Sequence, residues 1–320
     1  AIRPKVGIVC GSGLSGLSKV LDDAETINYE DIPHFPKTTI AGHAGELVFG
    51  YVGVLPIVCL RGRFHSYEGH PMKKVALPGR LFRALDCEIM LVTNAAGGIN
   101  SSFEVGDLMV ISDHIGFPLM TGNNPLVGPN ETMFGGPRFP PMSEAYDLAL
   151  RRLVIQCAQN MGLKYVRPEG TYCMVSGPNY ETAAESAMLK LCGADAVGMS
   201  TVPEVNTAVH SGLKVVGLSL ITNKVRLPGD SGPAASHEEV LDTVNLRTKE
   251  IELLVENVLL ELGKPDWPEK EKSLKEMKDD VPSSSLNSQG IINELKAINL
   301  AEITPVQALL KLDELKKMCA

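Results

Sequence analysis

Short runs rich in valine, isoleucine and leucine recur along this chain, and they restrict its fold more than any other feature. They lie at residues 6–10, 55–60, 88–93, 108–112, 171–176, 194–199 and 214–221. Most lack the apolar–polar alternation of a half-exposed strand, so each is predicted to be a strand buried on both faces.

Helical patterns alternate with these runs, at residues 72–85, 143–161, 182–192, 202–211 and 236–262. Two of them open with capping boxes, formed by Thr182 with Glu185 and by Ser236 with Glu239. The alternation predicts an α/β fold in which a central sheet is flanked by helices. Ligands of such sheets bind at the carboxyl ends of strands, so polar residues that follow a strand are the first candidates for a site.

The composition changes after residue 263, and this predicts the domain organisation. Residues 1–263 are expected to form one domain. Residues 264–290 combine three prolines, a mixed-charge run and consecutive serines, which is typical of a linker. Residues 291–320 contain two short amphipathic patterns and are predicted to be a helical tail of unknown role.

Charge and cysteine usage exclude several classes of protein. A net charge of −8 and a pI near 5.5 argue against non-specific binding to nucleic acid, which needs a basic face. No apolar run approaches the roughly 18 residues of a membrane span, so no membrane partner is expected. The seven cysteines include no CxxC pair, which favours a reducing, cytoplasmic location over a disulfide framework. No HExxH or clustered His/Cys set predicts a metal site.

Residues 198–201, GMST, have small or flexible side chains and lead from the strand at 194–199 into the helix at 202–211. A hydroxyl such as that of Ser200, together with N–H groups at a helix N-terminus, makes an anion pocket. Met199 beside it offers an apolar surface for a sugar.

Arg63 and His65 are separated by one residue, so on an extended segment both side chains point the same way. Arginine is the natural clamp for a phosphate dianion, and histidine is expected to add a donor. The alternative is that both residues lie on a solvated edge.

Residues 11–16, GSGLSG, match G-x-G-x-x-G after a strand. A dinucleotide site would require a following strand that ends in an acidic residue, whereas residues 26–31 are polar and run into prolines. A tight turn presenting Ser12 to a single phosphate is favoured, with a purely structural turn as the other alternative.

Two further segments follow strands. Tyr180 and Glu181 could stack a heterocycle and accept one of its N–H groups, although Glu181 could instead be a helix N-terminal charge. Asn223 ends a strongly apolar strand and can both donate and accept. Residues 94–98, NAAGG, predict either a second anion nest or close packing.

Taken together, these segments resemble the trimeric, low-molecular-mass purine nucleoside phosphorylases over about residues 4–263. The resemblance is carried, in the family's order, by CGSGL at 10–14, GHAG at 42–45, GRFHSYEG at 62–69, NAAGG at 94–98, SGPNYET at 176–182, VGMSTVPEV at 197–205, ITNK at 221–224 and HEEV at 237–240. It implies a single-domain, mixed central sheet of the nucleoside phosphorylase type. The tail after residue 264 and one extra residue within 134–139 depart from the family.

The resemblance also implies the residues of the site. Phosphate would be held by Ser12, Arg63, His65, Ala95 and Ser200. The ribose would contact Tyr67, Met199 and His237, and the base would contact Tyr180, Glu181, Val197, Gly198 and Asn223. A neighbouring subunit of a homotrimer would supply Phe139. The residues expected to act in catalysis are Asn223, Glu181, His65 and His237.

The implied reaction is reversible phosphorolysis of 6-oxopurine ribonucleosides and deoxyribonucleosides, such as inosine and guanosine, to a free base and (deoxy)ribose 1-phosphate. Phosphate would be a co-substrate, and neither a metal nor an organic cofactor is expected. A methylthioadenosine phosphorylase-like enzyme is the nearest alternative; that family carries Asp at the position of Asn223 and lacks Glu181. An NAD-dependent dehydrogenase and a non-catalytic binding module are more distant alternatives.

Overall fold

The computed structural model describes residues 2–11, 14–39, 44–231 and 237–277. Residues 1–275 form one compact unit and residues 276–320 a second, of which only the first two residues are described.

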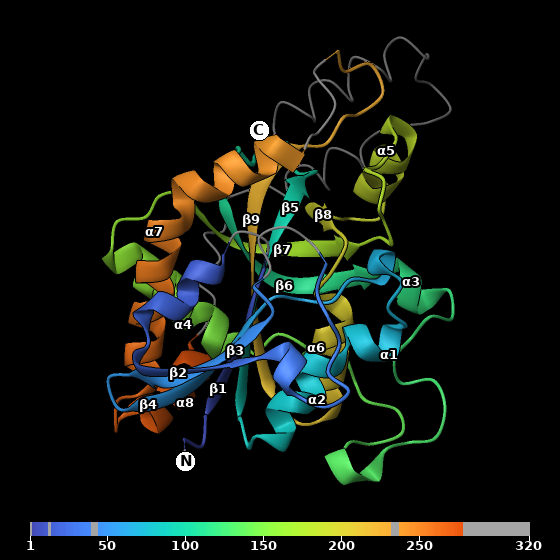
Figure 1. The fold of residues 1–320 in the computed structure, drawn as a ribbon. Coiled ribbons are helices and arrows are strands. Elements are labelled where there is room, and N and C mark those ends of the chain that lie inside the picture. Colours follow the sequence, from blue (N-terminus) through green and yellow to red (C-terminus); the bar gives the residue numbers. More distant parts are fainter. Residues whose placement is uncertain (1, 12–13, 40–43, 232–236, 278–320) are drawn as a thin grey trace, which may run out of the picture. The chain divides into compact units, whose positions relative to one another are not determined.

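The described residues form one mixed sheet in the first unit (Figure 1). Its strands are β1 (Val6–Cys10), β2 (Asp22–Asn28), β3 (Glu46–Val52), β4 (Leu55–Arg61), β5 (Ile89–Gly98), β6 (Leu108–Gly116), β7 (Val166–Met174), β8 (Ala196–Gly198) and β9 (Lys214–Lys224). Their order is β2-β3-β4-β1-β5-β8-β7-β6-β9, and β5 also pairs with β9. Strands β5, β8, β7, β6 and β9 therefore close into a ring, which leaves these strands no open edge.

Helices cover both faces of the sheet, as predicted. They are α1 (Met72–Val75), α2 (Leu77–Ala84), α3 (Phe117–Met120), α4 (Leu148–Asn160), α5 (Ala183–Leu191), α6 (Val202–His210), α7 (His237–Leu262) and α8 (Trp267–Glu276), with short 3-10 turns η1 (Ser15–Val20), η2 (Tyr29–Asp31), η3 (Ser66–Glu68) and η4 (Thr132–Phe134). Helices α4, α7 and α8 pack on one face, and α1, α2 and α6 pack on the other (Figure 1).

The core strands are buried on both sides, which explains their continuous apolar runs. In β5, Ile89 and Leu91 join the core under α4 and α7, while Met90 and Val92 join the core under α2 and α6. Burial on both faces removes any need for polar residues within these strands.

Two strands are missing from the sequence prediction. Strand β2 is exposed at every position and pairs only with β3, at the outer edge of the sheet. Its acidic residues suit an edge strand, where charge discourages further pairing, but they hide the strand from a search for apolar runs. The apolar run of strand β3 is broken in the sequence by Gly50, whose missing side chain lets Leu21 and the Asp22 carbonyl oxygen approach closely.

Several helix predictions need adjustment. The helix expected at 72–85 is divided at Ala76, because a second helix, α2, begins at Leu77 with Pro78 in its first turn. Helix α4 begins at Leu148 rather than near 143, since the Asp147 carboxylate accepts from the Leu150 N–H at 3.0 Å and caps the helix there. The Thr182–Glu185 capping box is confirmed, while Ser236 lies outside the described residues.

The stretch predicted as a linker contains α8. Leu274 of this helix is 4% exposed and lies in the main core, with Trp267 packed against the same core. Lys275 pairs with Asp147 at 3.3 Å. The charged residues that suggest a linker therefore belong to a helix whose apolar residues pack on the core. The first unit ends near residue 276 rather than 263. The remainder of the predicted linker and the tail lie outside the described residues.

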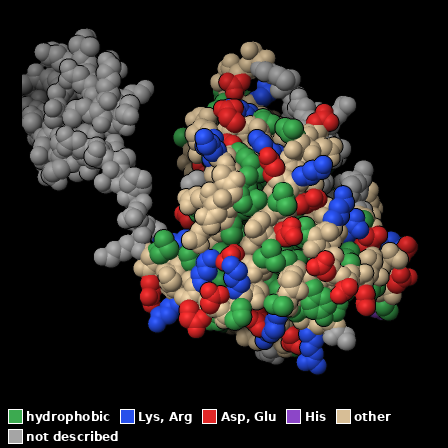
Figure 2. Space-filling model, turned by 90° about the vertical axis from the view of Figure 1, so that its left-hand side faces the viewer, with side chains coloured by type: hydrophobic (Ala, Val, Ile, Leu, Met, Phe, Trp, Pro, Cys, Tyr) green, Lys and Arg blue, Asp and Glu red, His purple; other side chains and the backbone are tan. Residues whose placement is uncertain are grey.

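In the described part of the chain, no helix is long and apolar enough to span a membrane. Basic and acidic side chains are interspersed on the face that Figure 2 shows, without a basic patch. The described cysteines are all free thiols, and only Cys192 is exposed.

Candidate active site

A pocket of about 750 Å³, its solvent-filled mouth included, opens where β4, β5 and β9 end. Strand β8 pairs with the end of β5 and brings the following residues to the same place. The pocket is lined by Arg63, His65, Tyr67, Asn94, Ala95, Ala96, Gly97, Tyr180, Glu181, Val197, Gly198, Met199, Ser200, Thr222, Asn223 and Val240.

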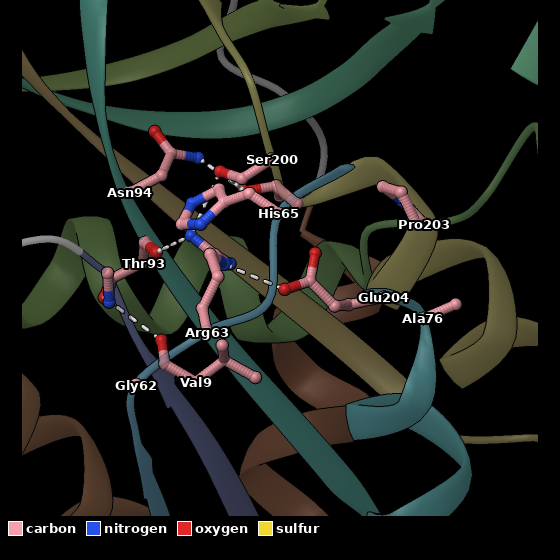
Figure 3. A network of polar contacts seen from close by, with 12 residues as sticks. Val9, Gly62, Arg63, His65, Ala76, Thr93, Asn94, Ser200, Pro203 and Glu204 are labelled. Carbon is pink, nitrogen blue, oxygen red and sulfur yellow. Dashed lines mark hydrogen bonds and ion pairs between the residues drawn. The ribbon is translucent and has the colours of Figure 1, made fainter. Parts of the chain in front are cut away.

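Arg63 forms the floor of one end of this pocket and is only 1% exposed. Its Nε donates to Glu204 Oε1 at 2.8 Å, and its Nη1 donates to the Thr93 carbonyl oxygen at 2.8 Å and to Ser200 Oγ at 3.1 Å (Figure 3). The solvated-edge alternative for Arg63 is therefore wrong. A guanidinium fixed in this way is a rigid positive group beside a pocket that can receive an anion.

Ser200 and Thr201 are held by a strained turn before α6. Thr201 has φ 77° and ψ −54°, and the Val202 N–H donates to the Ser200 carbonyl oxygen at 2.9 Å, which is a γ-turn. Asn94 Nδ2 donates to Thr201 Oγ1 at 2.9 Å, and the Ser200 N–H donates to Tyr172 Oη at 3.3 Å. A non-glycine residue at positive φ costs free energy, and these contacts hold it so that the Ser200 hydroxyl faces Arg63.

His65 is buried and bonded to Glu68. Its Nδ1 lies 3.0 Å from Glu68 Oε1, and Glu68 Oε2 accepts from the Thr39 N–H and hydroxyl at 2.8 and 2.7 Å. Burial favours a raised pKa of Glu68, but the hydrogen bonds from His65 and Thr39 outweigh it and lower that pKa to about 2. Glu68 is therefore a carboxylate, and it only accepts.

Burial is the largest influence on the pKa of His65 and lowers it, despite the opposing hydrogen bond to Glu68. The imidazole is consequently neutral near pH 7, with its proton on Nδ1 and an acceptor lone pair on Nε2. Without a bound anion, Nε2 of His65 is thus an acceptor, whereas the sequence leads us to expect a donor; the assignment of His65 to the phosphate site stays a prediction. Tyr67 stacks on the His65 ring, with centroids 4.6 Å apart and planes 15° apart.

The opposite end of the pocket carries the groups suited to a heterocycle. Glu181 is half-buried; burial, followed by the nearby Glu185, raises its pKa. Asn223 is 9% exposed, and its Oδ1 accepts from the Thr222 hydroxyl at 3.3 Å. Because that contact uses the amide oxygen, the NH₂ group of Asn223 is the donor that remains for a ligand.

The NAAGG segment belongs to β5 and does not follow it. Residues 97 and 98 continue the pairing with β9 after an irregularity in register. Extended, paired backbone does not present a nest of consecutive N–H groups, so that form of the alternative is excluded. A contact from the backbone of Ala95, which lines the pocket, stays a prediction. At Gly97 an added Cβ would lie 3.0 Å from Val225 and 3.3 Å from Asn223 Nδ2, which supports the close-packing alternative.

Comparison with known proteins identifies the family. A family model described as "Phosphorylase superfamily" matches residues 5–260. A purine nucleoside phosphorylase of Bos taurus is 52% identical over 253 residues, which cover 79% of this chain and 87% of that protein.

The chain belongs to the purine nucleoside phosphorylases.

Solved structures of this family agree with that assignment. A Schistosoma mansoni purine nucleoside phosphorylase in complex with inosine is 44% identical and superimposes with a TM-score of 0.78, covering 82% of this chain and 92% of that chain. A second structure, in complex with adenosine, has 45% identity, the same TM-score and the same coverage. The nucleoside phosphorylase fold predicted from the sequence is confirmed.

The dehydrogenase alternative is wrong for a member of this family, and the strand order gives the reason. A dinucleotide fold needs a parallel strand after the glycine-rich turn. Here the next strand, β2, is not the adjacent partner of β1 that such a fold requires, because β3 and β4 lie between them. The described part of the chain between β1 and β2 contains the 3-10 helix η1 rather than a crossover α-helix.

Most of the residues implied by the family resemblance line the pocket. Three others remain, and the structure describes the side chain of only one of them. Ser12 lies outside the described residues, and His237 begins α7 without a described side chain. Phe139 is 86% exposed and does not line the pocket of its own chain.

Glu204 is the most important residue missing from the sequence prediction. It reads as an ordinary acid in the first turn of a helix, yet it is 0% exposed and pairs with Arg63, which is 141 positions away. The one signal in the sequence is that this carboxylate lies among the apolar residues Val202, Pro203 and Val205 in the first turn of the helix.

Proposed function

We propose that this chain catalyses the reversible phosphorolysis of 6-oxopurine ribonucleosides and deoxyribonucleosides, inosine and guanosine among them, to the free base and (deoxy)ribose 1-phosphate. One observation carries the proposal. A buried, fixed guanidinium at Arg63 and an amide–carboxylate pair at Asn223 and Glu181 line the same pocket. An anion and a purine can therefore occupy it together.

The anion would be the nucleophile. Arg63, Ser200, Ser12 and the backbone at Ala95 hold phosphate below the sugar. Neutral His65 accepts a hydrogen bond from a phosphate or sugar hydroxyl. The glycosidic bond breaks through an oxocarbenium-like state, as in glycoside chemistry generally. Because phosphate attacks the sugar, no protein carboxylate is needed as nucleophile.

The base leaves with growing negative charge, and the pocket offers a group to receive it. The Asn223 NH₂ donates to O6 or N7, and this bond strengthens as the charge develops. Above its pKa, the Glu181 carboxylate accepts from N1–H and from the 2-amino group of guanine. Tyr180, Val197 and Gly198 enclose the base.

Tyr67, Met199 and His237 are assigned to the ribose. Phosphate is a co-substrate, and the proposal requires neither a metal nor an organic cofactor. A cytoplasmic location is supported by the buried free thiols, which persist in a reducing compartment.

The active form is proposed to be a homotrimer in which Phe139 closes the sugar side of a neighbour's pocket. Its exposure within one chain is 86%, which leaves the ring accessible to a neighbouring subunit.

Substrate choice between inosine and methylthioadenosine tests the assignment against its nearest alternative. The two base-directed side chains suit a 6-oxopurine, so hypoxanthine release from inosine should exceed adenine release from methylthioadenosine by at least 100-fold in kcat/KM, about two factors of ten. Both are measured in the same phosphate buffer. Faster cleavage of methylthioadenosine would favour the alternative family.

A further inference from the structure

The long loop between β6 and α4 lies against α2 and α6, far from its own pocket's base-binding end. The η4 turn of this loop lies beside α2, at the lower right of Figure 1. This stretch is rich in glycine, proline and asparagine, and Phe139 lies within it. Two independent sets of contacts hold the loop.

The first set joins the loop to the last residue of α6. His210 is 1% exposed, and its Nε2 lies 2.9 Å from Asn130 Oδ1. Asn130 Nδ2 in turn donates to the Gly136 carbonyl oxygen at 3.0 Å. Since an amide oxygen only accepts, His210 Nε2 must carry a proton. Burial, followed by the Arg80 guanidinium, lowers the pKa of His210, so this ring is neutral near pH 7.

Backbone packing reinforces these hydrogen bonds. A Cβ added at Gly136 would lie 1.9 Å from the His210 carbonyl oxygen, a distance that no side chain can tolerate. The loop therefore lies directly on the end of α6, and only glycine permits it. We call His210, Asn130 and Gly136 together the α6–loop contact.

The second set joins the loop to α2. Arg80 Nη1 pairs with Glu131 Oε2 at 2.8 Å, and the Arg80 guanidinium carbon lies 4.6 Å from the centre of the Phe134 ring. The loop is thus attached on both sides of η4, immediately before the segment that ends at Phe139.

We propose that the α6–loop contact positions Phe139 for the pocket of a neighbouring copy, with His210 and Asn130 as positioning residues. This inference rests on the proposed function, because it requires Phe139 to act in a neighbour. Helix α6 starts at the Ser200 turn of its own pocket and ends at His210. One short helix therefore connects the phosphate end of a chain's own pocket to the loop that carries Phe139. A loop fixed in advance avoids the entropy cost of ordering Phe139 each time a nucleoside binds.

Variants of the contact should weaken nucleoside binding without affecting phosphate. Asn130→Ala and His210→Ala should each raise the KM for inosine by about 2- to 10-fold, the worth of one neutral hydrogen bond, with the KM for phosphate unchanged. His210→Gln keeps an N–H donor and should restore much of the loss. Gly136→Ala tests the same contact by steric overlap and should raise the inosine KM at least as much. Asn123→Ala, an exposed asparagine of the same loop, is the matched control and should have no effect.

A double-mutant cycle with Phe139→Ala separates positioning from general damage to the loop. If Asn130 acts through Phe139, Asn130→Ala should add little to the inosine KM once Phe139 is already alanine. Additive effects, or an equal rise in both KM values, would overturn the positioning role. An unchanged inosine KM in Phe139→Ala itself would remove Phe139 from the neighbour's pocket, and the inference with it, while leaving phosphorolysis by the wild-type enzyme untouched.

Discussion

Arg63→Ala should be the most damaging single substitution in this protein. Two losses combine. The phosphate site loses its fixed cation, and Glu204, which is 0% exposed, is left as a buried charge without its partner. Removing one member of a buried ion pair costs about 3–5 kcal/mol of the free energy of unfolding. The melting temperature should therefore fall by roughly 6–20 °C for a domain of this size.

The catalytic loss should appear in the kinetic parameters for phosphate. Charge-assisted hydrogen bonds contribute about 1.5–3 kcal/mol, so kcat/KM for phosphate should fall by roughly 10- to 150-fold. Steady-state kinetics with phosphate varied at saturating inosine measures this, and thermal unfolding measures the stability.

A second variant distinguishes binding from instability. Arg63→Ala combined with Glu204→Gln removes the unpaired charge, so it should recover part of the lost stability while the phosphate defect remains. Arg61→Ala is the matched control: this arginine, in the same strand region, forms a partly buried pair with Glu46 at 2.6 Å and does not line the pocket. Its loss should lower stability less than Arg63→Ala and should leave the phosphate KM unchanged. An unchanged phosphate KM in Arg63→Ala would exclude Arg63 from the site.

The second large effect concerns the base. Inosine presents an acceptor at O6 and a donor at N1, which match the Asn223 NH₂ and the Glu181 carboxylate. Adenosine presents a donor at the 6-position and an acceptor at N1, so its N1 lone pair would face a carboxylate. Sites that hydrogen-bond a substrate group reject the mismatched analogue by up to roughly 10⁴–10⁵-fold. We expect adenosine to be a very poor substrate. A schistosome relative has been solved in complex with adenosine. Such a complex reports binding of adenosine in that protein, whereas our expectation is about kcat/KM.

Asn223→Asp should shift the preference toward adenosine. In its protonated form, the introduced carboxyl group would donate to N7 while its other oxygen accepts from the 6-amino group. Asn223→Ala is the control, because it should lower inosine turnover without any gain for adenosine. The roles given to Asn223 and Glu181 are wrong if wild-type protein cleaves both nucleosides equally well, or if the Asn223→Asp variant shows no shift.

The sequence allowed much of the fold to be predicted, because burial on both faces leaves a direct trace in composition. Runs such as that of β1 could be recognised without any structure. Strand β2 could not be recognised, because it lies exposed at the edge of the sheet and its residues are mostly polar. The linker prediction was partly wrong for a related reason: in α8, the buried Leu274 and the half-buried Trp267 are outnumbered by charged residues.

The site was harder to predict in detail than the fold. Local motifs indicate which segments carry chemistry, and most of the residues implied by the resemblance do line one pocket. Partnerships across the chain leave no local trace, as the buried pair of Arg63 and Glu204 shows. The protonation state of His65 likewise depends on burial and on Glu68, and neither can be read from the order of residues.

The measurement that tests this account most directly is nucleoside cleavage with and without phosphate. In the proposed mechanism the nucleophile is phosphate and not a protein side chain. Hypoxanthine release from inosine should therefore depend on phosphate and should yield ribose 1-phosphate in equal amount. The assay follows hypoxanthine by coupled oxidation and identifies the sugar product by ³¹P NMR, using phosphate-free protein as the reference. Collapse of the rate without phosphate is the predicted result. Equal rates in phosphate-free buffer, with free ribose as product, would make the enzyme a hydrolase and contradict the account.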